Sequence, residues 1–325
     1  MSTHHQRIER CILGEKTDRI PVALWKHFPV DDQSPEGLAQ ATLSFQQNFE
    51  FDLVKVTPAS SFCIRDWGAL DEWQGASEGT RNYTRRVIQT PEDWRKLYIL
   101  NPRKGYLGAQ LKCLSILHKE LGEETPIIQT IFSPLAQAKN LAGGERLLVH
   151  MRQNPEALHD GLKIISETTL SFIEEIKKTG ISGIFYAVQH AQYALLSQEE
   201  YKIFGRAYDL PILEPSKDMW LKMIHLHGMD VMFDMFTDYP IDIINWHDRE
   251  TAPSIGEGQS KFRGVVCGGI RRDTMVLGTP EDVKNEAQEA IRRTSGKRFI
   301  LSTGCVVPII APYGNIMAAL REKSE

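Results

Sequence analysis

Residues 222–228 read KMIHLHG, and residues 241–248 read IDIINWHD. Each stretch is a short apolar run that ends in polar side chains, and such runs alternate along the chain with amphipathic stretches. This alternation predicts βα units that build a parallel sheet. Working outward from the two stretches, we expect eight strands, at residues 20–25, 51–56, 126–131, 181–187, 222–227, 241–246, 262–267 and 297–301.

Eight strands alternating with helices in a chain of 325 residues predict a (β/α)8 TIM barrel, which is an α/β fold. We expect the barrel to form a single domain over residues 1–325, with an insertion after the second strand at residues 59–104. The competing architecture, an open doubly wound sheet, needs a glycine-rich fingerprint after an early strand. The sequence has no such fingerprint.

Charge and composition argue against several classes of partner. The net charge of −4 is unlike that of a nucleic-acid binder, which needs a basic face. No run of about 18 apolar residues occurs, so we expect no membrane span. The five cysteines are an odd and scattered set that does not indicate a disulfide framework. We therefore expect a cytoplasmic protein that acts on a small molecule.

In a TIM barrel the active site lies at the carboxyl ends of the strands. Five of the ten histidines fall at these positions in the predicted barrel. The candidate site residues selected there are Lys26, His27, Tyr186, His190, His225, His227, Asn245, His247, Asp248, Arg271 and Cys305.

His225 and His227 are two residues apart on a predicted strand, so their side chains point to the same face. Two imidazoles placed in this way can share a metal ion, and Cys305 can add a thiolate from the loop after the last strand. Two histidines and a cysteine with one open position suit a catalytic zinc ion. The alternative is that one histidine is a hydrogen-bonded core residue and the other faces a helix, since His-x-His is a weak signal.

Two further groups at the strand ends have both a functional and a structural interpretation. His247 and Asp248 form either an acid–base or substrate-binding pair or an exposed loop pair. Gly268 and Gly269, followed by Arg271 and Arg272, either approach an anion through backbone amides and guanidiniums or form a plain turn with solvated arginines.

Four segments, taken together and in this order, resemble the uroporphyrinogen decarboxylase superfamily. They are RIERCILGEKTDRIP at 7–21, IHLHG at 224–228, GTPEDV at 278–283 and TGCVVPIIAPYGNIMA at 303–318. The resemblance implies a (β/α)8 barrel, in agreement with the predicted strands.

One branch of this superfamily removes acetate-arm carboxyl groups from uroporphyrinogen without a cofactor. The family pattern has paired arginines near the first strand and an aspartate after the second. Here the two regions read ALWKHFPVDD at 23–32, without arginine, and KVTPASS at 55–61, without an acid. These departures make the true decarboxylase the poorer match, because a polycarboxylate substrate needs cationic partners.

The other branch contains zinc-dependent methyltransferases that move a methyl group between a corrinoid and a thiol. Their motif is His-x-Cys on the fifth strand with a distant Cys after the eighth. The matching positions are His225, His227 and Cys305, with His227 in place of the first cysteine, and histidine is an acceptable zinc ligand.

The resemblance therefore implies metal-assisted methyl transfer from a corrinoid, on a partner protein, or from another methyl donor to a thiol-type acceptor. We expect Zn²⁺ on the three matching residues, with the other candidates in two roles. The expected catalytic residues are His27, His247 and Asp248, and the expected substrate-binding residues are Lys26, Tyr186, His190, Asn245 and Arg271. The alternatives are a metal-free decarboxylase of uroporphyrinogen or a related tetrapyrrole, and a non-catalytic corrinoid or tetrapyrrole binder.

Overall fold

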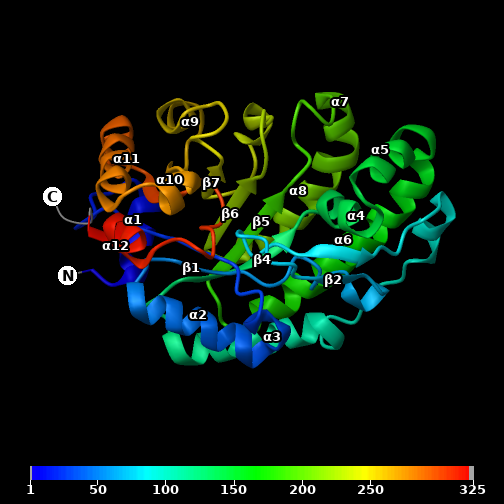
Figure 1. The fold of residues 1–325 in the computed structure, drawn as a ribbon. Helices are drawn as coiled ribbons and strands as arrows, with labels where there is room; N and C mark the ends of the chain where they lie inside the picture. The colour runs from blue at the N-terminus through cyan, green and yellow to red at the C-terminus, as the bar shows by residue number, and fades with distance from the viewer. Residues whose placement is uncertain (1, 322–325) are drawn as a thin grey trace.

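The computed structural model describes residues 2–321 of the chain. Its centre is a curled sheet of seven parallel strands in the order β1-β4-β5-β6-β7-β8-β9, with helices on the outside (Figure 1). This arrangement is TIM-barrel-like and follows the predicted alternation. The strands are β1 (Val54–Val56), β4 (Ile127–Phe132), β5 (Gly183–Val188), β6 (Leu221–Leu226), β7 (Ile243–Trp246), β8 (Val265–Ile270) and β9 (Phe299–Thr303).

The segment expected as the first strand, residues 20–25, is not a strand within the described chain. It makes one parallel bridge, between Val22 and Leu301 of β9, and on its other side the carbonyl of Val22 accepts a hydrogen bond from the amide of Asp52. The ladder stops here for two reasons. Pro21 has no N–H to donate, and the N–H of Val22 donates to the carboxylate of Asp52 at 2.8 Å.

Asp52 is the centre of a buried charge cluster that ties the N-terminal helix α1 (His4–Leu13) to the sheet. Its carboxylate accepts hydrogen bonds from Arg7 at 2.7 Å and from Arg19 at 2.6 Å, and it lies 2.8 Å from Nδ1 of His4. Burial acts to raise the pKa of Asp52, but the hydrogen bonds from His4 and Arg19 hold it below its usual range. The RxER…DRxP motif therefore has a structural role, since Arg7 also binds Asp18.

The remaining helices cover the outside of the sheet (Figure 1). They are α2 (Pro35–Phe49), α3 (Gly105–Leu121), α4 (Pro134–Ala142), α5 (Gly144–Gln153), α6 (Pro155–Lys177), α7 (Gln198–Tyr201), α8 (Ala207–Leu213), α9 (Ile255–Lys261), α10 (Arg272–Leu277), α11 (Pro280–Thr294) and α12 (Tyr313–Arg321). The GTPEDV motif begins α11, where Thr279 and Asp282 form a capping box. Within residues 2–321 no helix is long and apolar enough to cross a membrane.

Between β1 and β4 the chain forms a small antiparallel pair, β2 (Leu70–Glu72) and β3 (Asn82–Arg85). These strands lie in the segment expected as an insertion. Whether residues 59–104 are an insertion depends on a comparison with other members of the family. The expected insertion therefore stays a prediction.

The expected turn at Gly268–Gly269 is wrong, because both glycines lie inside β8. Gly269 has a φ of 106°, and a Cβ atom there would lie 2.6 Å from Cβ of Ala290 on α11. Gly269 therefore permits a left-handed backbone conformation and a close helix contact, as glycine in a strand commonly does, whereas a Cβ atom at Gly268 would meet the carboxylate of Asp248. The N–H of Gly269 donates to the carboxylate of Asp248, and the segment that follows begins with Arg271 as the exposed N-cap of α10, so anion binding here stays a prediction.

The parallel strands are buried on both faces, as in other helix-covered sheets. Such strands are normally apolar throughout, so polar side chains within them stand out. Those at the carboxyl ends of β6 and β7, and in the loop after β9, define the site described next.

Candidate metal centre

His225 and His227 lie at the carboxyl end of β6 and turn to the same side. Nε2 of His225 lies 3.5 Å from Sγ of Cys305, and Nδ1 of His227 lies 3.7 Å from the same sulfur. Cys305 follows β9, so the sheet brings together residues 80 positions apart in the chain. The structure therefore joins the three residues that the sequence selected as metal ligands.

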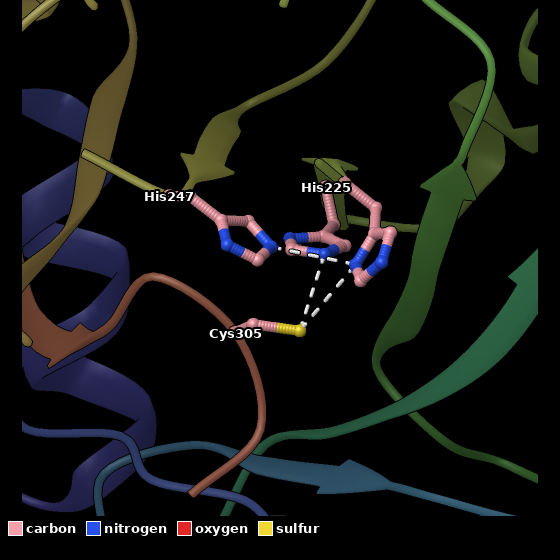
Figure 2. A group of neighbouring side chains, drawn as sticks. His225, His247 and Cys305 are labelled. Atoms are coloured by element: carbon pink, nitrogen blue, oxygen red, sulfur yellow. Dashed lines mark hydrogen bonds between the residues drawn. The ribbon is translucent and has the colours of Figure 1, made fainter. Parts of the chain in front are cut away.

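His247, which the sequence analysis selected as a catalytic residue, is the fourth member of this group. It follows β7, and its Nε2 lies 3.4 Å from Nδ1 of His227. In Figure 2 the side chains of His225, His247 and Cys305 point toward one another. One ligand atom from each of the four residues lies within 4.8 Å of all the others, and no second group of this kind occurs within residues 2–321.

Three of the six distances among these four atoms match those of a tetrahedral zinc site, and the remaining pairs lie within 4.8 Å. Bonds of about 2.0 Å to nitrogen and about 2.3 Å to sulfur require roughly 3.3 Å between two nitrogens and roughly 3.6 Å between nitrogen and sulfur. The distances given above are 3.4 Å for the nitrogen pair and 3.5 and 3.7 Å for the two nitrogen–sulfur pairs. The donor set of imidazoles and one thiolate also suits Zn²⁺ better than a hard cation such as Mg²⁺.

Asn245 fixes the ring of His225. Its Oδ1 lies 2.6 Å from Nδ1 of His225, while its Nδ2 donates to the carbonyls of Cys267 and Thr303. The two donated bonds orient the amide so that its oxygen accepts the proton on Nδ1. The lone pair of Nε2 therefore faces Cys305, as a metal ligand requires.

A chain of charged groups holds His247. Its Nδ1 lies 3.0 Å from a carboxylate oxygen of Glu250, which accepts hydrogen bonds from Arg272 at 2.9 and 3.1 Å. Arg272 in turn binds Glu78, which lies just before β3. Burial acts to raise the pKa of Glu250, but the bonds from Arg272 and His247 lower it to about 2, so this carboxylate is ionised.

Burial favours the form of the three histidines that can bind a metal ion, but it acts against the thiolate of Cys305. It lowers the pKa of His225, His227 and His247, which favours the neutral rings that can bind an ion, although the hydrogen bond to Glu250 acts in the opposite direction at His247. Burial also raises the pKa of Cys305, which opposes the thiolate. A divalent cation bound here would offset that penalty directly.

The group opens into a cavity of about 320 Å³, a size that suits a small organic ligand. His225, His227 and Cys305 line it, together with His27. Burial, followed by the charges of Lys55 and Arg81, lowers the pKa of His27 to about 3.

Two expected substrate-binding residues, Lys26 and Tyr186, lie outside this cavity. Nζ of Lys26 lies 5.5 Å from the ring centre of Phe28, and the hydroxyl of Tyr186 donates to Asp209 at 2.7 Å. The reason is the alternation of side chains along a strand. The inward residues beside them are Trp25 and His27 in one segment and Phe185 and Ala187 in the other.

Four other expected residues, Asp248, His190, Asn245 and Arg271, are not among those that line the cavity. The carboxylate of Asp248 accepts the amide of Gly269 at 3.1 Å, and burial raises its pKa to about 7. His190 is buried, its Nδ1 has no partner within the described chain, and burial followed by the charge of Lys139 lowers its pKa to about 4. The side chain of Asn245 is hydrogen-bonded to His225, and the side chain of Arg271 is exposed.

Sequence reasoning missed Lys55, a buried residue of β1 that lines the cavity. Its Nζ lies 3.2 Å from Oγ1 of Thr57 and 4.5 Å from the ring centre of Phe185. Burial lowers the pKa of Lys55 to about 7. The position of this lysine inside the otherwise mostly apolar run FDLVKV, at residues 51–56, was the signal that could have identified Lys55 as a site residue.

The cavity wall opposite the strands was also missed. It comes from the segment around β3, with Glu78, Tyr83 and Arg86, and from α4, with Lys139. No local pattern marks these residues as neighbours of β6, because their position depends on how the segment folds over the sheet.

The family model for uroporphyrinogen decarboxylase (URO-D) matches residues 3–323. The chain belongs to this family. It is 21% identical to the methylcobamide:CoM methyltransferase MtbA of Methanosarcina mazei over 97% of this chain and 95% of that protein. It is 23% identical to the MtbA protein of Methanosarcina acetivorans, over 71% of this chain and 68% of that protein. The likeness is thus to the corrinoid methyltransferase branch, as expected from the sequence.

Solved structures support the fold. A methyltransferase from Methanosarcina mazei superposes with a TM-score of 0.87 at 17% identity, covering 99% of this chain and 98% of that one. A B12-independent methionine synthase from Shewanella sp. gives a TM-score of 0.61 at 14% identity, covering 94% and 92% of the two chains.

Proposed function

We propose that this member of the family is a methyltransferase that transfers a methyl group to a thiol-type acceptor with the help of a bound metal ion, best fitted by Zn²⁺. The observation that carries the proposal is the convergence of four nitrogen and sulfur atoms within 4.8 Å, three of them from residues that line a small-molecule cavity. The similarity to methylcobamide:CoM methyltransferases supports the same reaction class.

In this proposal His225, His227 and Cys305 would hold the ion, and His247 would be a further ligand that the acceptor thiol replaces when it binds. An ion in this position supplies Lewis acidity, which lowers the pKa of a bound thiol so that it is present as thiolate. Asn245 and Glu250 orient His225 and His247, as their hydrogen bonds indicate. The cavity walls exclude water from the sulfur, and His27 contacts the substrate.

Lys55 provides the positive charge that faces the reacting sulfur. It is buried and lines the same cavity, and no carboxylate within residues 2–321 forms an ion pair with it. A buried ammonium without a counter-ion is costly. A thiolate in the cavity would reduce that cost, so Lys55 favours the anionic form of the acceptor.

The methyl donor in this proposal is a methylated corrinoid carried by a partner protein. The carbon–sulfur bond forms as the bond from the methyl carbon to the donor breaks, and the electrons of the broken bond stay with the donor. The free thiol loses its proton when the thiolate forms.

We also propose that residues 1–325 form one (β/α)8 domain, in which the segment 20–25 occupies the place of the eighth strand. The hydrogen bonds of this segment to Leu301 and Asp52 support that assignment. A reducing cytoplasmic setting agrees with five buried cysteines that are all unpaired in the structure.

Metal analysis of the purified protein tests the proposal. We expect about one zinc ion per chain in the wild type and loss of that ion in His227→Ala, while His118→Ala retains it. With methylcobalamin as donor, the metal-loaded wild type should transfer the methyl group to small thiols. Absence of stoichiometric zinc, with no effect of His227→Ala on transfer, would rule out the proposed site.

A further inference from the structure

The segment of residues 70–86, which contains β2 and β3, covers one side of the cavity and is called the lid below. Residues 78–83 of the lid line the cavity wall opposite the strands. Gly79 marks the closest approach, because a Cβ atom there would lie 2.5 Å from Cβ of His27 and 3.1 Å from Cγ2 of Ile309. Ile309 belongs to the loop after β9 that also carries Cys305. The lid therefore packs directly against the elements that form the site.

The lid has little structure of its own to hold it in place. Within the described chain β2 and β3 pair only with each other, and an isolated two-stranded pair is marginally stable in water. Among residues 70–86 only Asp71 and Gly79 are buried, whereas Ala69 and Ile88 on either side of the lid are fully buried. Segments with few buried apolar contacts open at a low cost in free energy. The lid is thus a segment that can move between two firmly anchored ends.

Two ion pairs fasten the lid, and they differ in exposure to solvent. Arg81 donates to the carboxylate of Asp32 at 2.6 Å, and both side chains are almost completely buried. Glu78 forms an ion pair with Arg272 of α10, and the side chain of Glu78 is 39% exposed. Because water competes better for the exposed pair, the Glu78 end of the lid is the one that opens more easily.

Arg272 also belongs to the chain of charged groups that ends at the candidate metal centre. Its Nη2 and Nε donate to the carboxylate of Glu250 at 2.9 and 3.1 Å, and this carboxylate lies 3.0 Å from Nδ1 of His247. The lid and the metal centre thus share one arginine, so a change that moves Arg272 from one end is transmitted to the other. Coupling of this kind is reciprocal, because each end changes the equilibrium of the other by the same factor.

We propose that Glu78 latches the lid to Arg272, and that Arg272 acts as a positioning residue which couples the lid to the metal centre through Glu250 and His247. The latch stands on contacts within the chain, and the coupling rests on the proposed function. With an ion in place His247 is fixed, Glu250 is held by His247, and Arg272 is held where it receives Glu78, so metal loading favours the closed lid. Opening of the latch exposes the cavity of about 320 Å³ to a donor such as a corrinoid, which is much larger than the cavity itself.

Hydrogen exchange, measured by mass spectrometry on peptides from residues 70–86, tests the latch in the metal-free protein. The wild type is compared with Glu78→Gln and with Glu72→Gln, a matched control that removes an exposed carboxylate from the same lid. We expect Glu78→Gln to raise the exchange rate of the lid about tenfold, the size expected when one partner of a charge-assisted hydrogen bond is removed. Exchange in Glu72→Gln should equal that of the wild type, and peptides from β6 show that each variant is folded. An unchanged rate in Glu78→Gln would overturn the latch.

The same peptides, followed with and without saturating Zn²⁺, test the coupling in the wild type and in His247→Ala, which keeps the other three proposed ligands. Zinc should slow exchange of the lid at least about fivefold in the wild type and should have almost no effect on the lid in His247→Ala. No slowing in the zinc-loaded wild type, or equal slowing in both proteins, would refute the coupling. If neither protein binds zinc, the proposed function and the coupling fail together, while the result for Glu78→Gln in the metal-free protein still decides the latch.

Discussion

His225 on β6 and Asn245 on β7 are register partners in the parallel sheet, and Nδ1 of the histidine lies 2.6 Å from Oδ1 of the asparagine. The amide of Asn245 cannot turn, because its Nδ2 donates to two backbone carbonyls. The sheet register therefore determines which ring nitrogen of His225 faces Cys305 and the candidate metal site. Residues outside the ligand set commonly tune a metal site in this way.

Replacing Asn245 should weaken metal binding without removing a ligand. Asn245→Ala leaves Nδ1 of His225 without its acceptor, so the ring is free to rotate. We expect the affinity for Zn²⁺ to fall about 10- to 100-fold, measured by competition with a chromophoric chelator. The exposed Asn285→Ala is the matched control. An affinity unchanged in Asn245→Ala would show that the sheet alone positions His225.

Glu250 should act on the metal only through His247. Glu250→Gln removes the charge that holds Nδ1 of His247, and we expect the Zn²⁺ affinity to fall about tenfold. In a His247→Ala background the same change should have almost no effect. This double-mutant cycle isolates the coupling between the two residues. Equal effects of Glu250→Gln in both backgrounds would mean that His247 is not a ligand.

The lowered pKa of Lys55 predicts a specific pH dependence of the free energy of unfolding. Burial lowers its pKa to about 7 from the ordinary 10.5, so between these values the unfolded chain binds more protons than the folded one. The cost of the buried ammonium is thus largest below pH 7 and disappears above about pH 10.5. Lys55→Met should stabilise the metal-free protein by about 1–3 kcal/mol at pH 6, with little change at pH 10.5. Urea unfolding at both values measures this, and a gain of equal size at both would contradict it.

Asp52 should be among the most sensitive positions for stability. Asp52→Ala leaves Arg7 and Arg19 without their shared carboxylate and frees the amide of Val22. We expect a loss of about 3–5 kcal/mol, as for other broken buried ion pairs. Asp160→Ala, whose partner Arg95 is exposed, should cost less than about 1 kcal/mol. Urea unfolding of the two variants compares them, and similar losses would show that the Asp52 cluster adds little.

Much of the fold followed from the sequence because apolar runs in a helix-covered parallel sheet are long and regular. The runs predicted at 51–56, 126–131, 181–187, 222–227, 241–246, 262–267 and 297–301 all contain or overlap strands. The errors have local causes. Pro21 and the carboxylate of Asp52 remove two ladder bonds from the first run, and two glycines continue β8 where a turn was expected.

Side-chain direction explains most of the outcome at the site. Residues two apart on a strand face the same way, and this rule placed His225 beside His227 correctly. The same rule, applied to residues 25–27 and 185–187, would have excluded Lys26 and Tyr186 in favour of their inward neighbours.

The sequence by itself determined the alternation of strands and helices, the membership of the family and the identity of three metal-ligand candidates. Only the tertiary structure decided that His247 joins His225, that Asn245 positions a ring, and that Arg86 and Lys139 face the same cavity. The physical reason is that periodicity fixes which face a side chain occupies. The atoms it meets there come from other strands and from the segment around β3, and their position depends on sheet register and packing over long separations in the chain.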